Sequence, residues 1–338
     1  MSSLLDTVAL IKDPYFDPEY AALYLEGNSS LFHFRYEEEE RFFSTLSIKR
    51  PIDSVADVTI DEEIYDLETP YGYGGYLANT TDTDFLRKAL DAYTRHCEEE
   101  KIVAEFIRFH PFNTSIRSFF DFFDFCIDDR PTIYIDTTLT TQSRHQTYSS
   151  KVRRKIRKCE RELSFFQTED LSTFKALYHD TMRRNRAADF YRFDDRFFDS
   201  LFSKPFSRLY AVSDDEEIVS MVLVLLGPDI MHIHLSANRS EKMHKNGNYL
   251  LFDRVCDEAR EAGCRYSFVG GGRSNRPDDT LLRFKRQFSS LSLPFYIAGK
   301  IFDQKTYRDL LNIHENIFPD LKSTPYFLKY RLTGGEGI

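Results

Sequence analysis

The alternation of hydrophobic and polar positions divides the chain into two halves that repeat one order of elements. In each half the pattern predicts a β-hairpin around an acidic turn, a further strand, a loop, a helix, a strand, a short helix and a last strand. In the first half these segments are residues 30–36 and 41–48, 64–67, 83–99, 102–109, 112–120 and 132–136. In the second half they are residues 208–213 and 218–226, 230–236, 249–262, 265–268, the helix around Phe284, and 294–302. The repeat predicts an α/β protein with mixed sheets (α+β in character) and two domains of one architecture, at residues 1–140 and 141–338.

The segment that links the two halves predicts a helix of unusual charge. Apolar side chains recur in it at the spacing of one helix face, at Val152, Ile156, Cys159 and Leu163. The other positions of residues 151–161 carry seven cationic side chains and one acid. We expect a helix that is anchored by a narrow apolar stripe and has a positive outer face. Such a face is either an ordinary solvated surface or a binding surface for the phosphates of a nucleotide, an RNA or a phosphorylated acceptor.

A run of glycines marks the end of a predicted strand in the second half. Residues 265–268 lead into Gly270, Gly271 and Gly272, and a short cationic helix follows. Glycine lets a ligand approach the backbone closely, and open α/β folds bind ligands beyond the carboxyl ends of their strands. This stretch is therefore either one edge of a binding site or a turn before a surface helix.

Composition limits the class of protein. The chain has 338 residues, a net charge of −9 and 41% hydrophobic residues, which is enough for two domains with cores of their own. Five scattered cysteines indicate reduced, mostly structural thiols in a cytoplasmic protein. No signal peptide and no apolar run of membrane-spanning length is evident. The acidic balance disfavours nucleic acid binding by the surface as a whole but leaves a local basic patch open.

Four groups of segments carry a resemblance to a known family, and they occur in the family's order. They are residues 70–75; 134–136 with 153–158; 234–237 with 246–251; and 270–272 with 282–288. Across about residues 60–290 the chain resembles the FemAB family, the aminoacyltransferases that build peptidoglycan cross-bridges, and their relatives in polysaccharide loci. The long charged insertion that forms a coiled-coil arm in some members is not evident.

The resemblance implies two tandem GNAT-like acyltransferase domains and an N-acyltransferase activity. The donor would be aminoacyl-tRNA or acyl-CoA, with no tightly bound cofactor. The acceptor would be an amine of a nucleotide- or lipid-linked cell-envelope precursor, such as a peptidoglycan stem peptide or an amino sugar, and tRNA is a candidate partner. The pyrophosphate loop of CoA-binding GNAT enzymes is only partly matched, at residues 245–248, so the choice of donor stays open.

The candidate catalytic residues come from the resemblance and from the strand pattern. The family's Phe-Lys pair falls on Phe284 and Lys285, where the lysine would stabilise the oxyanion or the leaving oxygen. Phe284 also shares a helix face with other apolar residues, which makes a core position equally open. His232 and His234 alternate with apolar residues on one strand, so they are either general bases with near-neutral pKa values or structural histidines. No metal site is expected.

The binding residues are predicted on both halves. The donor side comprises Arg153, Arg154, Arg157, Lys158, Gly247, Asn248, Gly270, Gly271, Gly272 and Arg273. The acceptor side comprises Tyr71, Tyr73, Arg108 and His110, at the loop and strand end that correspond to the glycine turn. A different class of function also fits the sequence: a non-catalytic GNAT scaffold that binds a phosphorylated glycan or RNA. The oligomeric state is left open.

Overall fold

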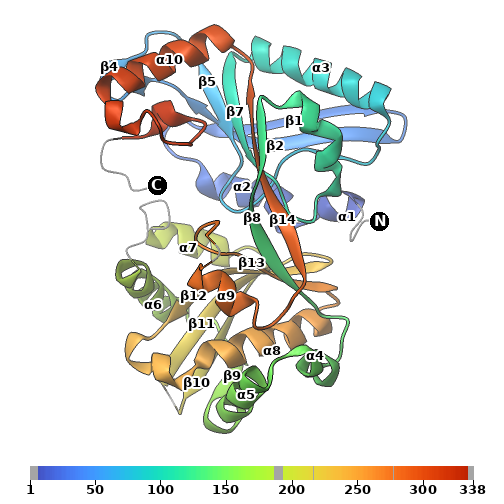
Figure 1. Cartoon of the computed structure of the whole chain (residues 1–338), viewed down its shortest axis with the longest axis vertical. Helices are drawn as coiled ribbons and strands as arrows, with labels where there is room; N and C mark the ends of the chain where they lie inside the picture. Colours follow the sequence, from blue (N-terminus) through green and yellow to red (C-terminus); the bar gives the residue numbers. More distant parts are fainter. Residues whose placement is uncertain (1–6, 186–192, 216, 277, 334–338) are drawn as a thin grey trace. The chain divides into compact units, whose positions relative to one another are not determined.

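The computed structural model describes residues 7–185, 193–215, 217–276 and 278–333, and its contacts divide the chain into two compact units (Figure 1). The first unit comprises residues 1–11, 15–129 and 295–338. The second unit comprises residues 12–14 and 130–294. The chain passes from one unit to the other within two long strands, β8 (Phe125–Asp136) and β14 (Ser292–Ile301).

The sheet of the first unit is covered by a helix on each face. Its strands lie in the order β1 (Ser30–Glu38), β2 (Arg41–Pro51), β5 (Tyr65–Glu68), β7 (Ile102–Arg108) and β14, and β6 (Leu77–Ala78) pairs with β2. Ile102 and Ile107 of β7 pack in the cluster of α3 (Thr83–Glu99), while Val103 and Phe106 pack in the cluster of α10 (Gln304–Ile317). The central strand β7 is apolar on both faces because helices cover both.

Short elements complete the first unit. They are α1 (Thr7–Leu10), η1 (Pro14–Phe16), α2 (Pro18–Ala21), η2 (Ala22–Tyr24), β3 (Ser54–Val55), β4 (Val58–Thr59), η3 (Thr114–Phe122), η6 (Pro319–Leu321) and η7 (Lys329–Arg331).

The second unit follows the same plan. Its strands lie in the order β8, β13 (Tyr266–Gly271), β12 (Ile230–Asn238), β11 (Glu217–Leu226), β10 (Ser207–Asp214) and β9 (Ser164–Gln167). Its described helices are α4 (Thr141–Thr147), α5 (Ser150–Glu162), α6 (Leu171–Arg184), α7 (Asp195–Phe202), η5 (Ser240–Lys245), α8 (Gly247–Glu261) and α9 (Thr280–Lys285). Helix α8 packs on β10, β11 and β13, and α6 packs on β12. The nearly continuous apolar run of β11 is buried.

The predicted order of elements is confirmed in both halves, and the helix predicted at residues 83–99 is α3. The segment predicted as a short helix at residues 112–120 is the 3-10 helix η3. Helices α6, α7 and α10 lie in segments for which no element was predicted.

The last strand of each half pairs within the other unit. Residues 132–136 of β8 pair antiparallel with β13, and residues 297–301 of β14 pair antiparallel with β7. The contacts therefore divide the chain at residues 129/130 and 294/295, which differs from the expected boundary at residues 140/141. The expected boundary followed the order of elements along the chain. That order does not show that β8 and β14 each pair in the unit formed mainly by the other half.

Candidate functional site

The central parallel pair of the second unit is joined only at its beginning. Within residues 217–276, β12 and β13 pair over residues 230–232 and 266–268, and both strands continue beyond that pairing. The register between β11 and β12 shifts at the same place, because Leu223 faces Leu235 while Val224 faces Ile233. His234 is the extra residue of this β-bulge. Such irregularities re-aim side chains and end strand pairing, and they are frequent beside active sites.

Helix α8 begins without a side-chain cap. In the described residues no side chain bonds to its first N–H groups, and Asn246 before it has a left-handed conformation with φ of 61°. A Cβ atom on Gly247 would lie 2.8 Å from Ser220 Oγ and 2.9 Å from Val219 Cγ1, so the close approach of α8 to β11 requires glycine. Open N–H donors and the positive end of the helix dipole favour an anion or a carbonyl oxygen at this point.

A pocket of about 190 Å³ lies at the start of α8. It is lined by Ser220, Asn238, Met243, Asn246, Gly247, Asn248, Tyr249 and Phe284. Ser220 Oγ donates a hydrogen bond to Asn238 Oδ1 at 2.9 Å, and Asn248 Oδ1 is buried with no hydrogen-bond partner in the described part of the chain. The volume corresponds to about six water-sized groups, which suits a small acyl group with polar atoms.

Of the predicted Phe-Lys pair, Phe284 lines this pocket and Lys285 is the next residue along the chain. Phe284 packs edge-on against Tyr249 and Phe252, with ring centroids 5.3 and 5.2 Å apart, and it also lines the pocket. Phe284 is thus partly buried against the core and also forms a wall of the pocket. Lys285 Nζ donates a hydrogen bond to Gly271 O at 2.6 Å. Burial lowers the pKa of Lys285 to about 7, against the opposing effect of the Asp279 carboxylate.

The glycine run is shaped by Asp279. One carboxylate oxygen accepts from Leu282 N at the start of α9, and the other accepts from the N–H groups of Arg273 and Ser274 at 2.9 and 3.1 Å. A Cβ on Gly272 would lie 2.6 Å from Asp279 Oδ1, so the backbone passes too close for any side chain there. Burial opposes the ionisation of Asp279, and these N–H donors outweigh it and lower its pKa.

The first two glycines of the run belong to β13 and not to a turn after residue 268. Gly270 has φ of 73° and follows a register shift against β8, where it pairs with Ile133, and Gly271 pairs with Thr132. The polypeptide leaves the strand at Gly272. The side chain of Arg273 is exposed, and its backbone carbonyl accepts a hydrogen bond from Arg130 Nη1 at 3.0 Å.

The two candidate histidines differ from the general bases that the strand pattern allowed. His232 is buried, and its Nε2 lies 2.7 Å from Asp13 Oδ2, which is also buried. Burial, with a smaller contribution from His232, lowers the pKa of His234 to about 3. An imidazole with that pKa is a very weak base, which favours the structural alternative for His234 over a general base with a near-neutral pKa. The alternation that suggested it does not reveal the bulge or the burial.

The predicted basic helix is α5, and its apolar stripe is confirmed. Val152, Ile156 and Cys159 are buried. Arg153 donates to the carbonyl oxygens of Tyr148 and His145, at 2.7 and 3.3 Å, and so has a structural role. The other predicted donor-binding cations of this helix are exposed: Arg154, Arg157 and Lys158.

Lys155 is the cation that the structure brings to the pocket. Its Nζ donates to Tyr249 Oη at 2.9 Å and lies 4.0 Å from the centroid of that ring. Sequence reasoning counted Lys155 in the basic run but did not select it. Ser220 and Asn238 were also not predicted, and only the family order of the surrounding segments offered a signal for them.

The predicted acceptor residues are packed side chains of the first unit. Arg108 forms an ion pair with Glu68 and donates to Thr69 O at 3.0 Å, so its guanidinium takes part in an internal network. The ring of Tyr73 packs edge-on against Tyr15 and Phe295, with centroids 5.3 and 5.2 Å apart.

The other two acceptor candidates have fixed surroundings as well. Tyr71 offers its backbone carbonyl to the hydroxyl of Tyr20 at 2.8 Å, and His110 is buried. Tyr71, Tyr73 and Arg108 are partly exposed.

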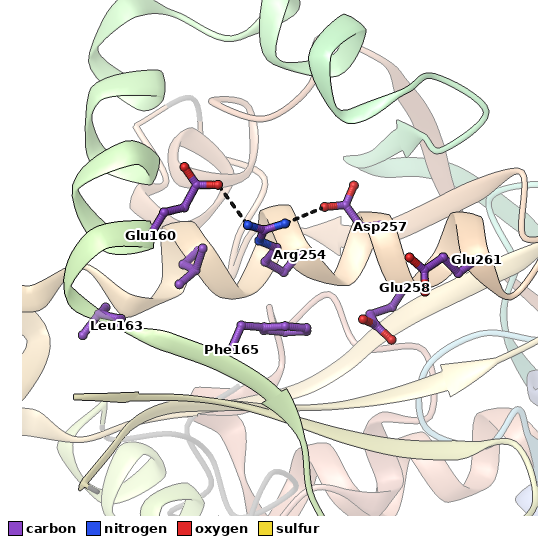
Figure 2. A pocket seen from close by; sticks show the side chains of 8 residues that line it. Glu160, Leu163, Phe165, Arg254, Asp257, Glu258 and Glu261 are labelled. Atoms are coloured by element: carbon purple, nitrogen blue, oxygen red, sulfur yellow. Dashed lines mark hydrogen bonds and ion pairs between the residues drawn. The ribbon is translucent and has the colours of Figure 1, made fainter. Parts of the chain in front are cut away.

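A second pocket of about 290 Å³ lies among α5, β9 and α8 (Figure 2). Its lining includes four carboxylates and one cation, Arg254, which forms ion pairs with Glu160 and Asp257 at 3.1 and 3.5 Å. Mutual repulsion of carboxylates adds to burial in raising the pKa of Glu258. This lining repels phosphates, so a phosphate-bearing donor favours the smaller pocket.

A comparison with protein families matches residues 146–286 to the acetyltransferase (GNAT) domain. This stretch is similar to a GNAT acetyltransferase domain. It contains α5, the parallel pair β12 and β13, the pocket at the start of α8, and Lys285. No curated protein matches the chain. Among the described residues no helix is long and apolar enough to cross a bilayer.

Solved structures extend the likeness beyond the GNAT acyltransferase domain. The crystal structure of FemX is 13% identical, with a TM-score of 0.69 over 91% of this chain and 98% of that chain. The C-terminal domain of a protein described as a lysylphosphatidylglycerol synthetase, from Agrobacterium fabrum, is 13% identical, with a TM-score of 0.50 over 92% and 95%. A protein of unknown function from Bacteroides thetaiotaomicron is 10% identical, with a TM-score of 0.51 over 89% and 93%.

At these identities the solved structures show a shared fold. The prediction of a FemAB-like fold with GNAT-like units is confirmed. The longest helix of the described residues, α3, has 17 residues, so the described part of the chain contains no coiled-coil arm.

Proposed function

We propose that the protein is an N-acyltransferase whose donor places its acyl group in the pocket at the start of α8. The observation that carries this proposal is the pocket at the start of α8, where Asn248 Oδ1 is buried without a partner in the described residues; Lys285 follows the wall residue Phe284, and burial lowers its pKa to about 7. A group that gains and loses a proton near neutral pH is suited to general acid–base catalysis. The exposed lysine of an ordinary helix surface has a pKa near 10.4.

The proposed reaction joins an acceptor amine to the donor's acyl carbon. The amine nitrogen attacks the carbonyl, the N–C bond forms, and the bond from carbon to the leaving sulfur or oxygen breaks. Neutral Lys285 accepts the proton that the amine loses, and the resulting ammonium returns it to the leaving group. The N–H groups at the start of α8 stabilise the oxyanion. Holding both reactants in one geometry supplies much of the remaining rate.

The donor side of the proposal rests on Gly247, Asn248 and residues 270–273, where β13 ends. Lys155 adds a cation at the pocket, which favours a donor that carries phosphates, either acyl-CoA or aminoacyl-tRNA. The GNAT match supports acyl-CoA, and the FemX-like fold keeps aminoacyl-tRNA as the second donor.

For the acceptor we propose an amine of a cell-envelope precursor, a peptidoglycan stem peptide or an amino sugar. Tyr71 and Tyr73 remain the acceptor residues of this proposal because they are partly exposed. Arg108 would have to leave Glu68 to contribute, and His110 is buried.

The test is a calorimetric titration with acetyl-CoA and CoA after RNase treatment, followed by the same titration with aminoacyl-tRNA. One of the two donors is expected to bind with micromolar affinity, about −8 kcal/mol. Gly247→Val should remove this binding, because its side chain would meet Ser220 and Val219. The matched control is Thr83→Val, at the first residue of α3. Full binding by a folded Gly247→Val protein would exclude the pocket as the donor site.

The alternative, a non-catalytic module, is separated from the enzyme by Lys285→Ala. An enzyme should keep donor binding in this variant and lose turnover. If the unchanged protein binds a donor but acylates no amine of either acceptor class, the scaffold for a phosphorylated glycan or RNA is favoured instead.

A further inference from the structure

Five cations project from one side of α5. They are Lys151, Arg154, Arg157, Lys158 and Arg161, and all five are exposed. With 3.6 residues per turn they fall within an arc of about 120°, centred opposite the buried stripe, and they extend about 15 Å along the axis. We call this surface the outer face of α5.

The charge of this outer face is barely neutralised by its surroundings. The acid closest in sequence, Glu160, is directed towards Arg254 of α8, with a nitrogen–oxygen distance of 3.1 Å. Glu162 lies 3.8 Å from Lys158, and both side chains are largely exposed, so their attraction is weak. The chain as a whole carries a net charge of −9, which makes the outer face a local exception.

We infer that the outer face of α5 docks on the surface of an anionic lipid bilayer. A bilayer is flat, so it can meet all five cations at once, and clusters of four to eight basic residues on a helix typically bind anionic lipid. The buried stripe of α5 belongs to the protein core and is not free to insert between lipids. Binding is therefore electrostatic, with about a fivefold contribution from each cation.

The geometry favours a bilayer over RNA. RNA-binding modules combine cations with bases stacked on aromatic side chains or read in a groove. The outer face is a single convex helix surface that consists of cationic side chains. The negative charge elsewhere on the molecule would be repelled by the same bilayer. The second unit should therefore bind with the outer face of α5 towards the lipid.

Docking and acyl transfer are separate claims. Adsorption to lipid needs no donor and no turnover, so it can be measured on the resting protein. The two connect through Lys155, on the flank of the same helix, which bonds to a residue of the acyl pocket. If both claims hold, Lys155 and the pocket residue Tyr249 lie close to the membrane surface when the protein is docked.

The experiment is co-sedimentation with vesicles of mixed phosphatidylglycerol and phosphatidylcholine, and with vesicles of phosphatidylcholine alone. The full chain should bind only the mixed vesicles and should be released at about 1 M salt, where the Debye length is about 3 Å. Arg154→Glu with Arg157→Glu should weaken binding by on the order of a hundredfold or more. The control, Lys305→Glu with Arg308→Glu on α10, changes the net charge by the same amount and should bind as the unchanged protein does.

Three results would overturn the inference. The first is equal binding to both kinds of vesicle, and the second is an equal loss in the α10 control. The third is binding of RNA, but not of mixed vesicles, that disappears with the α5 reversals. The fold of each variant is verified by its thermal unfolding, so a failure to fold is not mistaken for a loss of docking.

Discussion

The two units share one plan, yet the parallel pair at the centre of each ends differently. In the first unit β5 pairs with β7 along its whole length, Thr69 N continues the ladder to Phe106 O, and Gly74 still bridges to Phe109. In the second unit the pairing of β12 with β13 ends at His232 and Phe268. We call the first unit closed, because its central strands stay paired to their ends, and the second unit open, because its central strands separate.

The helices that precede β7 and β13 also differ at their first residues, because one has a side-chain cap and the other does not. Asp82 caps α3 by accepting a hydrogen bond from Phe85 N at 2.9 Å. Helix α8 begins at Asn246 and Gly247 without a side-chain cap in the described residues. A satisfied helix start stabilises the fold, whereas an open one is available to a ligand.

The buried polar groups complete the contrast. Glu105 of β7 accepts hydrogen bonds from Tyr76, Tyr93 and Ser47, at 2.6, 2.8 and 3.0 Å. In the second unit Asn248 Oδ1 is buried without a partner, and Lys285 has a pKa of about 7. Polar groups that satisfy one another stabilise a domain, while groups left in unfavourable states mark a place prepared for a ligand. In the proposed function, the first unit is structural at this position and the second unit carries the chemistry.

The largest expected effect is that of Lys285→Met in the open unit. Loss of the proton-transferring amine should lower kcat by about 10²- to 10⁴-fold while the protein stays folded and binds its donor. Turnover with the donor found by calorimetry is the measurement. Arg283→Met, an exposed cation on the same helix, is the control and should retain activity. Equal activity of the two variants would contradict the role of Lys285.

In the closed unit, Glu105→Gln should affect stability. Replacing one of the two acceptor oxygens with an NH2 donor that faces hydroxyl groups should cost about 1–3 kcal/mol of the free energy of unfolding. Burial raises the pKa of Glu105. The stabilisation it provides is therefore complete below its ordinary pKa and declines as the pH rises through the raised value.

The cost of Glu105→Gln should accordingly be larger near pH 4 than near pH 8, as measured by urea unfolding at both values. A cost that grows with pH would show that Glu105 is stabilised as the carboxylate.

A smaller effect is expected of Asp279→Asn, which changes the charge next to Lys285 but keeps a side chain that caps helices well. The Asp279 carboxylate raises the pKa of Lys285, so its removal should lower that pKa further. The rate that depends on neutral Lys285 should then reach its plateau at a lower pH. A pH–rate profile that is unchanged, or displaced to higher pH, would be inconsistent with this coupling.

The smallest effects are expected for substitutions at the starts of α3 and α8. Asp82→Ala removes the cap of α3 and should cost about 1 kcal/mol of unfolding free energy. Asn246→Gly removes no cap and keeps a residue that adopts positive φ, so it should change stability by only a few tenths of a kcal/mol. Thermal unfolding of both variants measures the difference. A larger cost at Asn246 would mean that the start of α8 is closed as well.

Local sequence patterns were sufficient for the repeated order of elements but not for α6, α7 and α10. The acidic turns, the spacing of α3 and the stripe of α5 are local signals, and each was confirmed. The exchange of β8 and β14 could not be predicted, because alternation in a strand does not indicate which sheet it joins. The low pKa of His234 and the contact of Lys155 with Tyr249 depend on packing between distant segments, which no local pattern encodes.

The most direct test of the central claim is an NMR titration of isotope-labelled lysine side chains in the resting protein. The account predicts one lysine that titrates near pH 7, in agreement with the pKa of about 7 for Lys285, and predicts that this signal is missing in Lys285→Met. No substrate is needed, so the result does not depend on the choice of donor. If every lysine titrates near pH 10.4, the ordinary value for lysine, the second unit lacks the proton carrier on which the proposed reaction depends.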